Sequence, residues 1–471
     1  MTTIVWLRQD LRIADNALWQ CAAERGEPVL ALYVLPRHWL LPGASGLDRL
    51  GAAKAGFLAQ CLEDTRDKLG QIGVPLVDVV GAPDSILVQL AGSGQAHIVT
   101  AEAQAPEEQA WLERLQKQGV AVSTAATQSL FTAADITSET ETFPATFSRF
   151  RRRVEKDARL VPQRPMTAPV PLKGVDDIPP PLHQLPPAAD CLQQRHHNRT
   201  GSIPAYPGGE TAALRHLHQY LADVPAVRQY KETRNQLAGT NFSSGLSGYL
   251  SAGALSARTA WHALLDWEVE HGACTGSYWL RFELLWREFF HWSLRHHGTA
   301  LFRYRGLDED DTRQHDALTS RQRTYWSRWC RAETGLPWID ASLVELMETG
   351  WISNRGRQLL ASFLIYEMGL DWRWGAEFFQ HYLLDDDVAS NWGNWAYIAG
   401  VGHDARGGRQ FAILEQFFRH DPGAAHVHAW LPHLAGLSSE QIYRIHCRAT
   451  ATGTDATMPS PMLLLDWART A

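Results

Sequence analysis

Three consecutive carboxylates give the strongest chemical signal in the sequence. Asp385, Asp386 and Asp387 are followed within eight residues by two asparagines and two tryptophans. Such a run is typical of an exposed loop that caps a helix. A flavin ring, however, needs an acceptor for its N3 hydrogen, donors at its carbonyls and a polar neighbour at N5. Asp385, Asp387 and Asn391 carry these groups, so the second interpretation is a flavin site.

Two arginines separated by one glycine, Arg355 and Arg357, lead into a helical pattern. Ordinary surface charge explains them equally well. A reduced flavin is an anion, however, and a buried anion requires a nearby cation. In that interpretation Arg357 pairs with an aspartate of the first cluster, and Arg355 faces a substrate phosphate.

Glu283, Trp286 and Arg287 are spaced i, i+3 and i+4, which places them on one face of a helix. An amphipathic helix with an internal ion pair is one interpretation. The other is a pocket for an extruded pyrimidine pair, in which Trp286 stacks on the bases and Glu283 binds their edges.

Hydroxyl groups gather at another helix start, in residues 243–247, shortly after the polar segment 230–234. Such hydroxyls usually cap the helix. Free backbone N–H groups at a helix start also bind phosphate, as a pyrophosphate-containing cofactor would require. The histidines show no ligand spacing and no two cysteines lie closer than 40 positions, so we expect no metal site.

Five short β-rich apolar runs lie in the amino-terminal part of the chain, before these clusters. They alternate with amphipathic stretches such as 50–69 and 107–118, which predicts a doubly wound, Rossmann-like α/β domain with a parallel sheet. No GxGxxG or P-loop pattern follows any run. The expected strands are 3–8, 28–35, 74–81, 96–103 and 120–127.

The remainder of the chain divides into a proline-rich stretch and a helical one. Residues 160–207 contain eleven prolines, which predicts an extended surface connector. After residue 208 the pattern is helical, and fifteen of the nineteen tryptophans follow residue 260, which suits dense packing, ring stacking or electron transfer. We expect an α/β domain over 1–135, a connector over 136–207 and an all-α domain over 208–471. The expected helices include 210–221, 279–294, 339–347, 356–367 and 374–384.

The net charge of −7 disfavours a general polyanion binder, so a nucleic acid would have to meet a local basic groove. Arg149, Arg152, Arg153 and Lys156 share a helical face by spacing, and are either such a groove or a solvated surface. With no leader-like segment and no apolar run of about 20 residues, we expect a cytoplasmic protein.

The segment 5–12, together with Asp15 and Asn16, resembles the opening strand and turn of DNA photolyases and cryptochromes. All four clusters resemble the FAD and DNA sites of that family in order and spacing. The match runs from residue 3 to about 433. Segments 208–213, 230–235, 353–358 and 391–395 are most similar to cryptochrome DASH. Gln358 and Tyr397 stand where classical dimer photolyases carry methionine and tryptophan, which makes the lesion pocket more polar.

The resemblance implies an amino-terminal antenna domain and a carboxy-terminal FAD-binding catalytic domain, with roles for individual residues. Glu283, Asn391, Trp395 and Trp372 are the expected catalytic residues, the two tryptophans as the inner members of an electron-transfer chain. The outer tryptophan is replaced by Thr319, so either Trp326 or Trp329 substitutes for it or photoreduction is slower, and Ala412 replaces a common asparagine. Glu108 lies in a segment similar to one that contacts a folate antenna, 5,10-methenyltetrahydrofolate.

Expected to hold FAD are Tyr230, Ser243, Ser244, Gly245, Leu246, Ser247, Trp286, Arg357, Asp385, Asp386, Asp387 and Asn391. Expected on the DNA side are Arg234, Glu283, Trp286, Arg287, Asn354, Arg355, Gln358, Tyr397 and Arg409.

The implied function is blue-light repair of cyclobutane pyrimidine dimers by a monomer, in single-stranded or looped DNA, where extrusion of the lesion requires less energy. One alternative is a photosensory cryptochrome that signals through FAD photoreduction. Another is a cofactor-free helical DNA-binding scaffold, which predicts a colourless protein.

Overall fold

The computed structural model describes residues 1–137, 143–166, 171–197, 207–237, 242–307, 318–404 and 406–448. Its amino-terminal part is a five-stranded sheet of order β3-β2-β1-β4-β5, in which every pair is parallel. The predicted α/β fold is confirmed, and each strand ends within two residues of its expected bounds. The strands are β1 Thr2–Leu7, β2 Val29–Pro36, β3 Leu76–Gly81, β4 Ala96–Ala101 and β5 Val122–Ala125.

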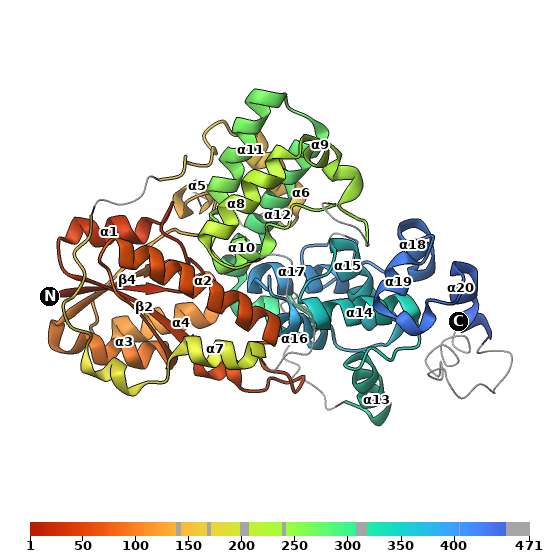
Figure 1. Ribbon diagram of the computed structural model, residues 1–471, viewed down its shortest axis with the longest axis horizontal. Helices are drawn as coiled ribbons and strands as arrows, with labels where there is room; N and C mark the ends of the chain where they lie inside the picture. The colour runs from red at the N-terminus through yellow and green to blue at the C-terminus, as the bar shows by residue number, and fades with distance from the viewer. Residues whose placement is uncertain are drawn as a thin grey trace.

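Helices cover both faces of the sheet (Figure 1). Because side chains alternate along a strand, Ile4 and Trp6 join a smaller apolar cluster with α3 (Pro83–Ala91) and α4 (Pro106–Lys117). Val5 and Leu7 join the larger cluster with α1 (Ala17–Arg25) and α2 (Ala52–Gln71). The larger cluster continues into the carboxy-terminal helices, so the sheet and the helical part share one hydrophobic core.

The predicted extended connector is in part helical and returns to the sheet. It contains α6 (Phe147–Lys156) and α7 (Ala188–His197), and α7 packs along α2. Between them, the backbone carbonyl of Lys173 accepts from Val29 N–H at 2.8 Å, in an isolated bridge beside the sheet. The prolines therefore mark irregular backbone and helix starts, and the boundaries of 136–207 remain a prediction.

The carboxy-terminal part is helical, as predicted, and lies to the right of the sheet in Figure 1. Each of the five expected helical segments corresponds to a helix, with 356–367 divided between α15 and a π-helix, Phe363–Glu367. No helix among the described residues is long and apolar enough to cross a membrane. The remaining helices are α5 Ala133–Thr137, α8 Glu210–Ala222, α9 Val224–Thr233, α10 Ser247–Ala252, α11 Ala257–His271, α12 Thr275–His297, α13 Ser320–Trp329, α14 Pro337–Thr349, α15 Asn354–Ser362, α16 Trp372–Tyr382, α17 Val388–Ala399, α18 Ile413–His420, α19 Ala425–Trp430 and α20 Ser439–Arg448.

The turn after β1 joins the two parts of the molecule. Arg12 is buried and donates to the carbonyls of Gly253 at 2.9 Å and of Asp15 at 2.8 Å. Gly253 follows α10 with φ +69°, and a Cβ there would lie 1.9 Å from the carbonyl oxygen of Gln9. The opening motif thus has a structural role, because it fixes α10 against the sheet.

Candidate functional site

A pocket lies among α15, α16, α17 and the segment that carries the three aspartates. It brings residues expected to hold FAD together with Asn354 and Gln358, which were expected on the DNA side. A ligand in this pocket would therefore reach both sets of side chains. The lining residues are Asn354, Arg357, Gln358, Ala361, Phe379, Leu383, Asp385, Asp386, Asp387, Ser390, Asn391, Asn394, Trp395 and Ile398.

Arg357 and Asp385 form the ion pair that the sequence predicted. Arg357 Nη1 lies 3.1 Å from Asp385 Oδ1 and Nη2 lies 2.8 Å from Oδ2, a bidentate geometry. The Asp385 side chain is 1% exposed and that of Arg357 is 26% exposed. The guanidinium is thus held by a buried carboxylate while part of it remains open to the pocket.

Asp387 begins α17 and stays ionised there. One of its oxygens accepts from Ser390 N–H at 2.7 Å, as a helix N-cap does. The other lies 2.9 Å from Nε2 of the buried His291. Burial alone would raise the pKa of Asp387, but His291, with support from Arg287 and Ser390, holds that pKa well below its usual range.

Asn391 presents a buried amide oxygen that suits a ligand. Its Nδ2 donates to the carbonyl of Ala376 and to Asp386 Oδ1, both at 3.0 Å. Since both partners are acceptors, they fix which end of the amide is nitrogen. Asn391 Oδ1 is buried and lacks a hydrogen-bond partner within the described ranges. A donor on a bound ring would satisfy it, so the pocket fits a flavin.

The hydroxyl-rich segment lies against the aspartates. α10 is capped by Leu246 without a side-chain hydrogen bond, so the serines of 243–247 do not cap the helix as first expected. Ser251 of the same helix donates to the carbonyl of Asp386 at 2.9 Å. Tyr230 is buried, and burial raises its pKa to about 12. The helix that follows the fourth cluster is therefore in contact with the aspartates, and the serines of 243–247 have no capping role.

Arginines expected on the DNA side converge near the pocket. Burial lowers the pKa of Arg355, and three positive neighbours lower it further: Arg234, Arg409 and Arg419. Arg234 forms an ion pair with Glu283. Nε of Arg355 and Nε of Arg409 are buried without a hydrogen-bond partner in the described part of the chain. Guanidinium groups this close together favour an anion between them.

Trp286 lies in an aromatic stack. Phe147 of α6 covers one of its faces, with ring centroids 3.8 Å apart and planes 14° from parallel. Tyr397 meets Trp286 edge-on at 5.6 Å, and its hydroxyl accepts from Arg409. Phe290 also stacks against Trp286, with ring centroids 5.4 Å apart and planes 30° from parallel, so aromatic side chains already pack around this ring.

Arg287, predicted on the DNA side, contacts backbone carbonyls, and its role toward DNA stays a prediction. Its guanidinium donates to the carbonyl of Gln128 at 2.8 Å and to that of Leu250 at 3.5 Å. It thus binds the backbone where the two domains meet. The spacing that placed it on one face with Glu283 did not identify these partners, which come from other elements.

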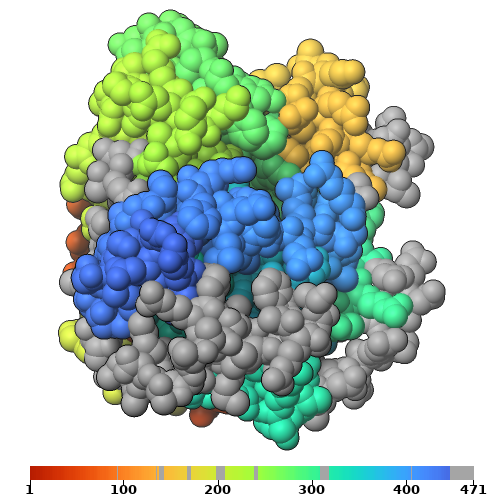
Figure 2. Space-filling view, turned by 90° about the vertical axis from the view of Figure 1, so that its right-hand side faces the viewer, coloured from red at the N-terminus to blue at the C-terminus, as the bar shows by residue number. Residues whose placement is uncertain are grey.

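The basic residues of α6 share one face, as expected. Arg149, Arg152, Arg153 and Lys156 line a shallow open groove. Figure 2 shows the yellow-orange atoms of α6 and the light-blue atoms near residue 400 on the same side of the molecule. A basic groove on α6 therefore lies on the same side of the molecule as residues near 400, although the net charge of the chain is negative.

The two inner tryptophans lie between α16 and α17. Trp395 lines the pocket, and its ring lies so close to Gly375 that a Cβ there would be 2.1 Å away. Trp372 lies on α16, one turn before Gly375, and its Nε1 donates to the carbonyl of Tyr304 at 2.9 Å. Trp326 contacts Trp374, on another face of α16, and Thr319 is the N-cap of α13.

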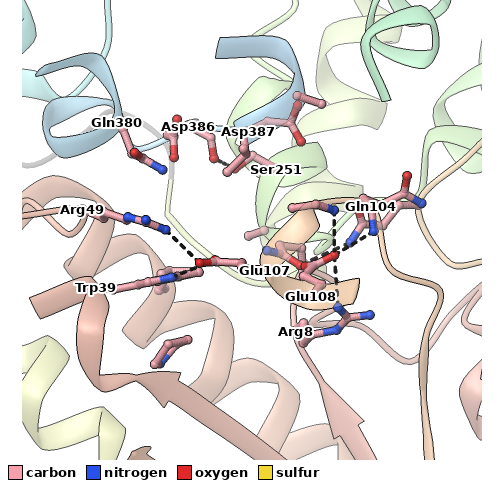
Figure 3. Close-up of a pocket in the computed structure, with 18 of the residues that line it drawn as sticks. Arg8, Trp39, Arg49, Gln104, Glu107, Glu108, Ser251, Gln380, Asp386 and Asp387 are labelled. Carbon is pink, nitrogen blue, oxygen red and sulfur yellow. Dashed lines mark hydrogen bonds and ion pairs between the residues drawn. The ribbon is translucent and has the colours of Figure 1, made fainter. Parts of the chain in front are cut away.

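A second cavity lies between the sheet and the helical domain (Figure 3). Its walls include Trp39 and Glu107 on one side and Gln380 and Asp386 on the other. Glu108, the expected folate contact, lines it, but Glu108 Oε2 pairs with Arg8 at 3.1 Å and accepts from the backbone N–H of Gln104 at 2.8 Å. Asp386 and Asp387 belong to both cavities and form the wall between them.

Sequence reasoning missed three partners of the site: Lys54, which pairs with Asp386, His291, which pairs with Asp387, and Phe147, which stacks on Trp286. Each is separated from its partner by more than 90 residues. The run of three aspartates between apolar residues was the available signal for Lys54 and His291, because carboxylates that become buried require cations or donors.

Comparisons with known proteins agree with this geometry. A family described as "DNA photolyase" matches residues 3–171, and one described as "FAD binding domain of DNA photolyase" matches 279–470. A cryptochrome DASH of Gloeobacter violaceus is 34% identical over 94% of this chain and 88% of its own length. The crystal structure of a Synechocystis sp. PCC6803 cryptochrome matches with TM-score 0.86 and 30% identity, covering 100% of this chain and 98% of that one. A class III photolyase of Agrobacterium tumefaciens matches with TM-score 0.78 and 25% identity, over 100% and 98%.

Proposed function

The chain belongs to the DNA photolyase and cryptochrome family, and from this premise we propose that it uses blue light to split cyclobutane pyrimidine dimers in DNA. One observation carries the proposal. Glu283 pairs with Arg234, which is clustered with Arg409 around Arg355, and Arg355 directly follows Asn354 of the flavin-type pocket. A protein that only absorbs light needs no such anion site next to its chromophore.

FAD is the cofactor of this family's helical domain. When bound and reduced, it supplies one electron on excitation by blue light. We propose that Arg357 balances the negative charge of the reduced ring, since it is anchored by Asp385 and partly open to the pocket. The oxygen of Asn391 accepts from a ring N–H, and the serines of 243–247 with Tyr230 bind the phosphate end.

The protein groups position the lesion and stabilise charge. Arg355 and Arg409 bind phosphates that flank the dimer, because their clustered charges favour an anion. Glu283 binds the edges of the extruded bases, held in orientation by Arg234. Trp286 stacks on a base at the part of its ring that Phe147 and Phe290 leave uncovered. Protons are not transferred by any of these side chains.

Single-stranded or looped DNA is the proposed substrate. Gln358 lines the flavin pocket and Tyr397 lies at the edge of Trp286, so polar groups border the lesion. A pocket bordered by polar groups offers the bases less stacking surface, and a single strand needs no base pairs to be broken before extrusion.

The interdomain cavity is the proposed antenna site, with a folate as its ligand. It lies at the carboxyl ends of β1 and β2, where ligands of parallel sheets bind. Trp6, Trp39 and Trp111 give it flat apolar walls.

Photosensory signalling is the second candidate, and the pair Trp395 and Trp372 favours it, because these buried rings on adjoining helices suit photoreduction of FAD. Illumination of reduced protein with dimer-containing oligonucleotides decides between the two functions. Recovery of thymine supports repair, whereas an intact dimer, together with photoreduction of a separate sample illuminated in the oxidised state, supports signalling.

A further inference from the structure

Lys54 and Asp386 form a buried ion pair between the two domains. Lys54 Nζ lies 2.7 Å from Asp386 Oδ2, and the side chains are 11% and 0% exposed. Lys54 stands in the first turn of α2, where the helix dipole disfavours a cation. A buried ion pair also contributes little net stability. Neither helix formation nor folding therefore accounts for this lysine.

The other oxygen of Asp386 reaches the flavin pocket. Asp386 Oδ1 accepts from Asn391 Nδ2 at 3.0 Å, and Asn391 Oδ1 has no hydrogen-bond partner within the described ranges. A continuous path thus leads from an ammonium group of the α/β domain, through one carboxylate, to the amide that faces the pocket. Since an ionised carboxylate can only accept, it keeps the amide nitrogen on its own side.

We propose that Lys54 is a positioning residue for the flavin. It keeps Asp386 ionised, and Asp386 in turn holds the oxygen of Asn391 toward N5 of the ring. The inference rests on the proposed function in one respect, namely that Asn391 faces N5. That nitrogen carries a hydrogen only in the reduced ring, so an oxygen beside it favours reduced flavin and an NH2 group favours oxidised flavin.

The charge of Lys54 is required for this arrangement. Burial raises the pKa of Asp386, and Lys54 is the largest opposing influence. Without the ammonium group, the buried carboxyl would take up a proton. A protonated carboxyl also donates, so the oxygen of Asn391 can turn toward it and leave the NH2 group at the ring.

The test compares Lys54→Met with the parent protein, both purified with FAD and equilibrated at a series of potentials. The ratio of reduced to oxidised flavin is read from absorbance. In Lys54→Met we expect this ratio to fall about tenfold at a fixed potential, the effect of one buried hydrogen bond, equal to about 30 mV for a two-electron couple. Lys54→Arg should restore the ratio to within about twofold, since it retains the cation.

Lys68→Met is the matched control. Lys68 lies on the same helix and also pairs across the domains, with Nζ 2.8 Å from Glu210 Oε2. Glu210, however, accepts from the backbone N–H groups of Ile13 and Ala14, not from the flavin pocket. We expect Lys68→Met to lower the melting temperature and to leave the flavin ratio unchanged.

Asp386→Asn tests the same path if Lys54→Met loses its flavin. Lys54 would retain the oxygen of the new amide, whose NH2 group would then face Asn391 and draw its oxygen away from the ring. The ratio should again fall.

Equal ratios in the parent, Lys54→Met and Asp386→Asn would overturn the proposal, as would an equal fall in Lys68→Met. These results are separable from the proposed function. A parent that repairs dimers while the ratios stay equal contradicts only the role of Lys54. A parent that holds FAD and releases no thymine contradicts only repair.

Discussion

Arg234 of α9 and Glu283 of α12 form an ion pair beside the arginine cluster, with side chains 15% and 33% exposed. A pair this accessible contributes less than about 1 kcal/mol to folding. The position of Glu283 among cations is thus better explained by a ligand than by stability. The pair fixes the Glu283 carboxylate close to Arg234, whose positive charge, like that of Arg409, lowers the pKa of the half-buried Arg355 further than burial alone does.

Glu283→Gln should lower the repair yield about tenfold, because a neutral amide replaces a charged hydrogen-bonding partner of the bases. The free energy of unfolding should change by less than about 1 kcal/mol, and the flavin content should stay the same. Thymine recovery and urea unfolding measure the two effects. Glu268→Gln is the control, since Glu268 of α11 pairs at 3.0 Å with Arg281 of α12, the helix that carries Glu283. Unchanged recovery in Glu283→Gln would remove the assigned role.

Arg355→Gln should weaken DNA binding at all sequences and reduce the slope of log K against log salt by about one. The reason is the loss of one phosphate contact. Fluorescence anisotropy with a labelled single strand, titrated at several salt concentrations, measures the slope. Arg114→Gln is the control: it removes an exposed arginine from α4 of the α/β domain and should leave the slope unchanged. Equal slopes for Arg355→Gln and the parent would place the DNA elsewhere.

Arg357→Met should release FAD and destabilise the fold by about 2 kcal/mol, because Asp385 would remain buried without its partner. Arg357→Lys should recover part of the stability but less of the flavin affinity, since a lysine cannot make the bidentate contact. Flavin content after gel filtration and the urea midpoint test both statements. If Arg357→Met retained its full flavin content, the ion pair of Arg357 and Asp385 would not be part of the cofactor site.

The fold was more predictable than the partners of the site. The five strands and the main helices followed from periodicity, because burial of one face imposes a regular pattern. The pairing of Arg357 with Asp385 followed from the need of a buried anion for a cation. Lys54 and Phe147 were not predicted, since nothing local in a sequence states which distant side chain neutralises a carboxylate or covers a ring. Arg287 shows the same limit, because helix spacing specifies a face but not the carbonyls it meets.

Stability should fall between about pH 4.5 and pH 8 in part because of Glu345. Burial raises the pKa of Glu345 to about 8, although the positive charge of Arg357 opposes the shift. In this window the folded protein retains a proton that the unfolded chain has lost, so folding weakens as the pH rises. Glu345→Gln imitates the protonated form and should be more stable than the parent by at least about 1 kcal/mol at pH 9 and similar to it at pH 5. Urea unfolding at both pH values measures the difference.

Glu348→Gln, one turn further along α14, is the control for this pH effect. It should follow the parent at both pH values. A Glu345→Gln variant whose stability parallels the parent from pH 5 to pH 9 would contradict the assignment of the buried proton.

Light-dependent recovery of thymine from a defined single-stranded oligonucleotide that contains one cyclobutane dimer tests the central claim most directly. The protein is reduced, mixed with the strand and divided between blue light and darkness, and a duplex of the same sequence is treated in parallel. We predict recovery in the light alone, with a higher yield from the single strand than from the duplex. Flavin that is fully reduced and absorbs the light, with intact dimer in both substrates, would contradict the account.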